Sequence, residues 1–146
     1  MRKLHLPLAA LALGVILSAN TCSDKDNGKA GVSADMIKGK WVLQSLDGNA
    51  VKTPEGIEQP YLSVDSTGEN LSGYGGCNRI FGTMKVSNDS ISFPGLAATR
   101  MYCEETQKLE NSFLEALNAT TTYSIKNDEL VLMGGKELAM FRRTSE

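Results

Sequence analysis

Hydrophobic and polar positions alternate in short runs along most of the chain after residue 39, a pattern typical of half-buried β-strands. Many of these runs end at Asn, Asp or Gly residues that favour tight turns. The strands expected from this pattern cover residues 41–46, 61–65, 70–74, 82–87, 90–93, 123–125, 130–132 and 138–141. Three short runs joined by tight turns at the end of the chain indicate an antiparallel meander.

The period of the pattern changes between residues 104 and 119. Leu109, Phe113 and Leu117 recur every four positions, which places them on one face of an α-helix. Glu104 and Glu105 stand at its expected start, where the helix dipole favours negative charge. We therefore predict an α+β, mostly β fold. It is a strongly curved antiparallel sheet or partial barrel of seven to eight short strands, with one amphipathic helix packed on it.

The first 21 residues have the layout of a secretory signal. Arg2 and Lys3 precede an apolar run over residues 6–17, which is too short to span a bilayer comfortably. Cys22 follows this run and resembles the lipidated cysteine of bacterial lipoproteins. The alternative is an ordinary signal peptide cut near Ala19, with Cys22 left as a spare thiol.

These features divide the chain into a lipoprotein signal peptide (1–21), a lipid-anchored flexible tether (22–38) and one folded domain (39–146). The tether is polar and has no periodicity. Cleavage before Cys22 leaves a net charge of about −4, because Arg2 and Lys3 are removed. This mild negative balance argues against nucleic acid as a partner, since neutralising phosphates needs a basic patch.

Catalytic and metal-binding chemistry is limited by the absence of histidine from the mature chain. The single histidine, His5, lies inside the signal. Nucleophilic sites that use a histidine base are therefore excluded, and two cysteines without partners at zinc spacing do not make a metal site. We expect a protein that is not an enzyme and that needs no cofactor or metal.

The stretch from Gly73 to Cys103 has the most distinctive composition. Gly73, Gly75 and Gly76 allow a positive φ or a close backbone approach directly after a strand. A phosphate-binding loop is the functional alternative, but the Gly-Lys-Ser/Thr ending and the following helix are missing. We expect Asn78 to hydrogen-bond nearby backbone, with a ligand contact as the alternative. Two arginines, Arg79 and Arg100, are interpreted as surface charges, or as an anion site if the fold joins them.

Several landmarks in and around this stretch stand in a characteristic order. They are Trp41 in the first strand, Gly73-x-x-Gly76-Cys77-Asn78 followed by Gly82, Thr99-x-Met101-x-Cys103, and Glu110 in the helix. Together they resemble the META-domain family of HslJ-like proteins over residues 39–144. The resemblance implies a small β-rich fold with one helix and an association with stress-related and envelope proteins. It implies no agreed biochemical activity.

The two cysteines of the domain are expected to pair. With Cys22 bound to lipid, Cys77 and Cys103 remain in an exported protein, where disulfides form and persist. Closing a loop of about 27 residues stabilises a domain by about 3–4 kcal/mol in the chain-entropy model. Two buried free thiols are the alternative.

These observations predict a non-enzymatic, monomeric lipoprotein of a bacterial envelope, anchored in the outer membrane and facing the periplasm or the cell surface. It would act in stress tolerance or envelope maintenance by binding an envelope protein or a small ligand. One alternative is a module for a small apolar ligand held between sheet and helix. The candidate lining residues are Tyr61, Tyr74, Phe81, Phe113 and Tyr123. The other alternative is an inhibitor-type partner of an envelope enzyme or secretion component.

Overall fold

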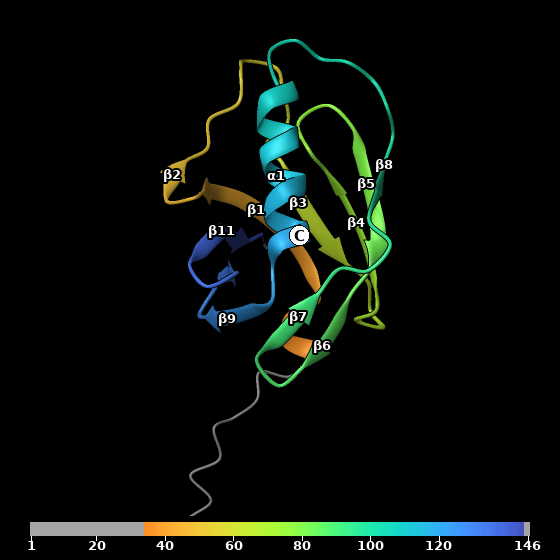
Figure 1. The fold of residues 1–146 in the computed structure, drawn as a ribbon, viewed down its shortest axis with the longest axis vertical. Helices are drawn as coiled ribbons and strands as arrows, with labels where there is room; N and C mark the ends of the chain where they lie inside the picture. Colours follow the sequence, from red (N-terminus) through yellow and green to blue (C-terminus); the bar gives the residue numbers. More distant parts are fainter. Residues whose placement is uncertain (1–33, 145–146) are drawn as a thin grey trace, which may run out of the picture.

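The computed structural model describes residues 34–144, so the expected signal, Cys22 and most of the expected tether lie outside the described residues. Figure 1 shows a β-rich fold with one α-helix, α1, along one side of the sheet. The elements are η1 (Ala34–Met36), β1 (Gly39–Leu46), β2 (Asn49–Ala50), β3 (Tyr61–Val64), β4 (Asn70–Tyr74), β5 (Arg79–Thr83), β6 (Lys85–Ser87), β7 (Ser90–Ser92), β8 (Ala97–Ala98), α1 (Gln107–Ala119), β9 (Thr122–Lys126), β10 (Glu129–Met133) and β11 (Glu137–Arg143).

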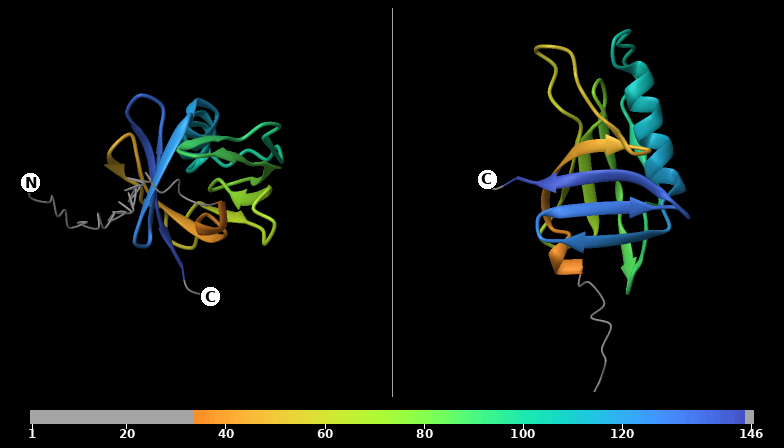
Figure 2. Two further views of the ribbon diagram at one scale, coloured as in Figure 1. Left: turned by 90° about the horizontal axis from the view of Figure 1, so that it is seen from below. Right: turned by 90° about the vertical axis from the view of Figure 1, so that its left-hand side faces the viewer.

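All the described strands belong to one antiparallel sheet. Their order is β6-β7-β9-β10-β11-β1-β3-β4-β5-β8, and β2 pairs with β1 outside this path. The sheet curls strongly, so that strands β9 to β11 run across strands β3 to β5 (Figure 2). This arrangement confirms the expected fold class and the C-terminal meander, in which β10 pairs with both β9 and β11.

The sheet contains more strands than expected. Residues 82–87 were expected to form one strand, but β5 ends at Thr83 and β6 begins at Lys85. Met84 lies between them, and its N–H donates to the Glu69 carbonyl at 2.7 Å. The chain changes neighbours here, because β5 pairs with β4 and β8 whereas β6 pairs with β7. The two-residue strands β2 and β8 are too short to produce a detectable alternation.

The helix and the sheet close over a filled core. Phe113 of α1 is fully buried, and its ring lies 5.9 Å from that of Phe141 on β11. Trp41, Leu43 and Leu132 are also fully buried. Burial of this apolar surface stabilises the contact between α1 and the sheet.

The folded domain begins earlier than residue 39. Ile37 is 1 % exposed, and its carbonyl accepts a hydrogen bond from Nε1 of Trp41 at 2.5 Å. The Arg143 guanidinium, which lies 4.2 Å from the Trp41 ring, donates to the carbonyls of Met36 and Lys38. These contacts hold residues 34–38, which fall in the expected tether, against the domain.

The helix begins later than expected. Residues 104–106 form a turn, and α1 runs from Gln107 to Ala119. As expected, Phe113 and Leu117 of its apolar face are buried and Leu109 packs against the core. Among residues 34–144, no helix is long and apolar enough to cross a membrane.

Candidate functional site

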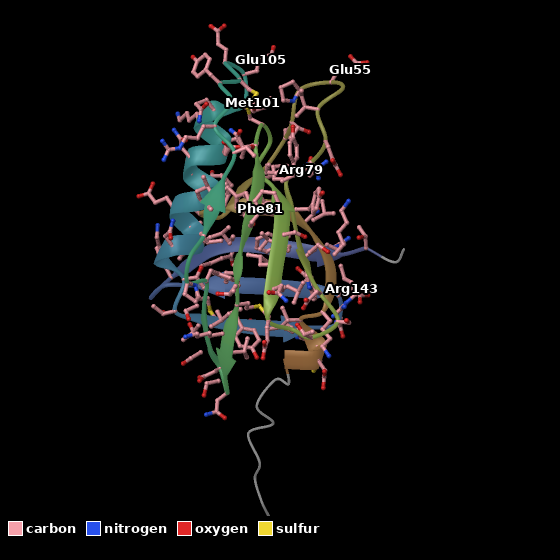
Figure 3. All side chains as sticks on the ribbon, turned by 90° about the vertical axis from the view of Figure 1, so that its right-hand side faces the viewer. Glu55, Arg79, Phe81, Met101, Glu105 and Arg143 are labelled. Atoms are coloured by element: carbon pink, nitrogen blue, oxygen red, sulfur yellow. A yellow bond between two sulfur atoms is a disulfide. The ribbon has the colours of Figure 1, made fainter. Side chains whose placement is uncertain are left out.

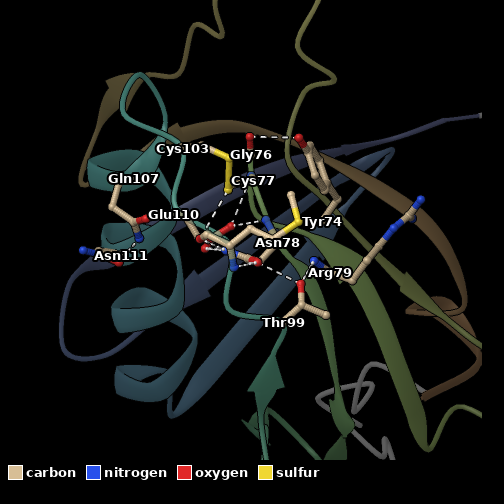
Figure 4. The surroundings of a disulfide bond; sticks show 11 residues. Tyr74, Gly76, Cys77, Asn78, Arg79, Thr99, Cys103, Gln107, Glu110 and Asn111 are labelled. Carbon is tan, nitrogen blue, oxygen red and sulfur yellow. Dashed lines mark hydrogen bonds between the residues drawn. A yellow bond between two sulfur atoms is a disulfide. The ribbon is translucent and has the colours of Figure 1, made fainter.

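A disulfide joins Cys77 and Cys103, with sulfur atoms 2.00 Å apart and Cα atoms 5.8 Å apart (Figure 4). Cys77 lies in the turn between β4 and β5, and Cys103 lies just before α1. The expected pairing is therefore confirmed, and the alternative of two free thiols is wrong. The bond ties the segment that precedes the helix to the sheet. We call residues 99–103 the braced loop.

A buried carboxylate lies beside this disulfide. Glu110 of α1 is 2 % exposed, and its Oε2 accepts the backbone N–H groups of Cys77 at 3.1 Å and Asn78 at 2.5 Å. Its Oε1 accepts the Asn78 side-chain amide at 2.6 Å. Burying a carboxylate is costly unless it is hydrogen-bonded, so these three donors allow Glu110 to occupy the interior.

The Asn78 side chain connects this carboxylate to the braced loop. Its Nδ2 also donates to the Met101 carbonyl at 3.0 Å. Its Oδ1 accepts the Met101 N–H at 2.7 Å and the Thr99 hydroxyl at 2.8 Å. Both Nδ2 hydrogens and the carbonyl oxygen of this amide are therefore in use. Asn78 binds backbone as predicted, but that backbone belongs to Met101, 23 positions away, and not to nearby residues.

Glycines allow the turn after β4 to approach the helix. A Cβ on Gly75 would lie 2.7 Å from both Cγ and Oε2 of Glu110. Gly76 has a φ of +111°, a conformation that side chains rarely adopt, and a Cβ there would meet Thr106 at 3.4 Å. The glycine pair thus positions the Cys77 and Asn78 N–H groups at the carboxylate.

Tyrosine and arginine side chains surround the turn. The Tyr74 hydroxyl donates to the Gly76 carbonyl at 2.8 Å. Burial raises the pKa of Tyr74 above 10.0, and the charges of Glu58 and Glu110 raise it further, whereas Arg79 lowers it. The Arg79 guanidinium binds the Tyr61 hydroxyl at 2.9 Å.

Arg79 and Arg100 are not part of one site. Arg100 lines a surface pocket of about 520 Å³ between the braced loop and α1, and Arg79 is not among its lining residues. The polar groups of Asn78 and Glu110 at this pocket are occupied by the hydrogen bonds described above. Within residues 34–144, no group of three or more His, Cys, Asp or Glu side chains is placed to hold a metal ion.

The backbone of the braced loop is held, but its two large hydrophobic side chains are exposed. Met101 is 63 % exposed and Tyr102 is 77 % exposed. Figure 3 places Met101 at the same end of the domain as Glu55 and Glu105. The arrangement presents a protruding apolar pair on a constrained backbone.

The five aromatic residues expected to line an apolar cavity do not gather. Phe113 and Tyr123 belong to the core cluster, whereas Phe81 is 49 % exposed. Tyr61 and Tyr74 contact each other with ring centroids 6.4 Å apart. A filled core between helix and sheet explains why these side chains form no common cavity.

The structure brings together most of the landmarks that the sequence singled out. The cluster at the disulfide contains Gly76, Cys77, Asn78, Thr99, Met101, Cys103 and Glu110. Three others lie elsewhere: Trp41 in the core, Gly73 against the Tyr61 carbonyl, and Gly82 against Leu96.

The burial of Glu110 and the contact made by Gly75 were missed. Glu110 precedes Phe113 by three positions and Leu117 by seven, a spacing that places it on the apolar face of the helix. That spacing was the available signal for its burial. Nothing in the sequence could show which glycine would lie against it.

Comparisons with known proteins identify relatives of this chain. The family model described as META domain matches residues 34–145. The chain is 29 % identical over 136 residues to heat shock protein HslJ of Escherichia coli strain K12, covering 90 % of this chain and 94 % of that protein.

Solved structures share the fold. An NMR structure of a protein from Burkholderia xenovorans has a TM-score of 0.60 and 25 % identity, covering 99 % of both chains. Another NMR structure has a TM-score of 0.62 and 27 % identity, covering 77 % of this chain and 95 % of the other. A crystal structure of a DUF4847 family protein from Bacteroides vulgatus is similar in fold alone, with a TM-score of 0.54 and 16 % identity over 78 % of this chain and 99 % of the other. With its family model covering most of the chain and its motif residues gathered at one disulfide, the chain belongs to the META-domain family.

Proposed function

We propose that this protein is a non-enzymatic envelope lipoprotein, anchored through lipid on Cys22, that supports stress tolerance or envelope maintenance by binding another protein. The observation that carries the proposal is the set of hydrogen bonds around Glu110. Three N–H donors occupy its carboxylate, and the adjoining Asn78 amide holds the backbone of Met101. The motif residues thus constrain a loop.

The arrangement of these groups supports the non-enzymatic part of the proposal. A general base must be within reach of a substrate proton, whereas Glu110 is 2 % exposed and faces backbone donors of its own chain. The cysteines that could act as nucleophiles are joined to each other. These contacts support a structural role for the motif and a binding role for the surface that it holds.

The cellular part of the proposal rests on two further observations. The apolar run at residues 6–17 is followed by Cys22, the layout of a lipoprotein signal. The relative in Escherichia coli is named a heat shock protein, which supports a role in stress. A lipid on Cys22 would place the domain at a membrane surface through residues 23–33.

The test of the anchor compares the wild-type protein with Cys22→Ser in the bacterium of origin. We expect the wild-type protein in the membrane fraction, labelled by an alkynyl palmitate analogue, and the variant in the soluble fraction without label. A variant that is processed normally and still sediments with membranes would contradict the lipid anchor.

The test of the stress role uses a strain that lacks the gene. We expect this strain to lose viability after a heat or detergent challenge, and the wild-type gene to restore it. Cys22→Ser should restore viability less well if membrane attachment is needed. Equal survival of the deletion strain and the parent under every challenge would contradict the proposed role.

A further inference from the structure

We propose that Met101 and Tyr102 form a docking tip that inserts into an apolar pocket with a basic rim on another envelope protein. The inference rests on the proposed function, because it names the surface through which the anchored protein would bind its partner. Three independent features of the domain support it: the exposure of the tip, the charges beside it and its position relative to the start of the domain.

The tip combines exposed apolar side chains with a fixed backbone. Met101 and Tyr102 are the two most exposed large hydrophobic residues between residues 34 and 144, at 63 % and 77 %. The Asn78 amide binds both the N–H and the carbonyl of Met101, and Cys103 is held by the disulfide one residue beyond Tyr102. A backbone already held in one conformation loses less entropy on binding than a free loop does. Met and Tyr are also enriched in the buried centres of protein interfaces.

The charges next to the tip indicate the partner's chemistry. Glu104 and Glu105 are exposed and directly follow Cys103. Glu55 is exposed at the same end of the domain (Figure 3). Exposed basic residues are also close: Arg100 precedes the tip, and Lys52 and Lys108 line one surface pocket together with Glu105. An apolar pocket that carries Lys or Arg on the side facing Glu104 and Glu105 is complementary to this surface.

The position of the tip favours a protein over a lipid surface. The domain begins at η1, which lies at the opposite end of the molecule from Met101 and Glu105 (Figure 3). A chain anchored at Cys22 would enter the domain at η1, so the end of the domain farthest from the tip would be the end joined to the anchor. The neighbouring glutamates would also be repelled by anionic lipids. Both features argue against insertion of Tyr102 into the bilayer.

Photo-cross-linking in the bacterium of origin tests the position of the interface. The full-length protein carries p-benzoylphenylalanine in place of Tyr102, or in place of Ser124, an exposed residue on β9 that serves as the matched control. We expect a protein adduct from position 102 that is absent at position 124 and is lost when Met101→Ser is added. The same adducts at both positions, adducts with lipid alone, or no adduct would overturn the proposal.

Binding measurements with the purified partner, once cross-linking has identified it, test the proposed chemistry of its pocket. We expect Tyr102→Ser to raise the dissociation constant by at least about tenfold, because aromatic residues at the centre of an interface contribute much of the binding energy. Ser124→Ala should leave the dissociation constant unchanged. Glu104→Gln with Glu105→Gln should slow association and reduce its dependence on salt. The cross-linked peptide should map to an apolar pocket with basic side chains at its edge. A Tyr102→Ser constant within twofold of wild type, or a pocket without basic side chains, would overturn the inference.

A vesicle experiment tests whether the docking tip binds a lipid bilayer instead of a protein. The Cys22→Ser protein is mixed with vesicles of phosphatidylethanolamine and phosphatidylglycerol at a ratio of about three to one. We expect no co-sedimentation, and co-sedimentation that is lost in Tyr102→Ser would overturn the inference.

Different results would contradict the docking tip and the lipid anchor. An anchored wild-type protein without a specific Tyr102 adduct contradicts only the docking tip, whereas a specific adduct from a protein without lipid contradicts only the anchor.

Discussion

Glu110 and Asn78 bind each other twice, through the backbone N–H of Asn78 to Oε2 at 2.5 Å and through its Nδ2 to Oε1 at 2.6 Å. Both residues are almost fully buried. One end of the Asn78 side chain therefore faces the helix, and its remaining bonds go to the Met101 backbone and the Thr99 hydroxyl. This pair joins helix, turn and braced loop into one unit, with the disulfide as a covalent link beside it.

Removal of the Glu110 carboxylate should strongly destabilise the domain. Glu110→Ala leaves the Cys77 N–H, the Asn78 N–H and one Nδ2 hydrogen without their acceptor in a buried site. We expect a loss of about 3 kcal/mol or more in the free energy of unfolding, measured by urea denaturation. Glu115→Ala is the matched control, because Glu115 is exposed on the same helix, and it should change the free energy by less than about 0.5 kcal/mol. A Glu110→Ala protein as stable as this control would contradict the structural role of the carboxylate.

Gly75→Ala should destabilise the domain through a clash with the same carboxylate. The new methyl group would lie 2.7 Å from Cγ and Oε2 of Glu110. Overpacking of this kind costs about 1–3 kcal/mol. In a double-mutant cycle, Gly75→Ala should cost much less in the Glu110→Ala background, because the atoms it meets are gone. Additive effects of the two substitutions would show that the contact does not determine the cost.

Loss of the disulfide should lower stability without changing the architecture. We expect the Cys77→Ser, Cys103→Ser protein to lose about 3–4 kcal/mol in the chain-entropy model, measured by denaturant unfolding. Alkylation followed by mass spectrometry provides the accompanying test. Cys77 and Cys103 should react only after reduction of the unfolded wild-type protein, and reaction before reduction would show that the bond is absent.

Protonation of Asp65, which follows β3, should account for part of the stability that the domain loses in acid. Its carboxylate accepts bonds from the Thr67 hydroxyl at 2.6 Å and the Asn70 side chain at 2.7 Å, and these hold its pKa well below the ordinary value of 3.8. A group whose pKa is lower in the folded state stabilises the native state at pH values above its unfolded-state pKa. This contribution is lost as pH falls below about 4.

Asp65→Asn removes this titration. Between about pH 5 and pH 2, the midpoint temperature of unfolding should fall less in the variant than in the wild-type protein. Thermal unfolding monitored by circular dichroism measures this temperature. Equal losses in the two proteins over this range would contradict the contribution of Asp65.

The expectations that succeeded depended on local pattern. The alternation of Leu130 and Leu132 and the four-residue spacing of Phe113 and Leu117 report which side of an element is apolar, and both correctly indicated burial. The change of partner at Met84 was not predictable in the same way. Residues on both sides of it are in strands, and only the position of neighbouring strands decides where one pairing ends.

The sequence by itself determined the family and the presence of many short strands with one helix, because periodicity and motif spacing are properties of the chain. It favoured the pairing of Cys77 with Cys103, which the structure then established. Only the tertiary structure decided that Glu110 is buried, that Asn78 holds the Met101 backbone and that Tyr102 is left exposed. The physical reason is that a carboxylate can be buried only where enough donors converge on it. Those donors come from a turn more than 30 positions away in the chain, so their convergence is a property of the folded molecule.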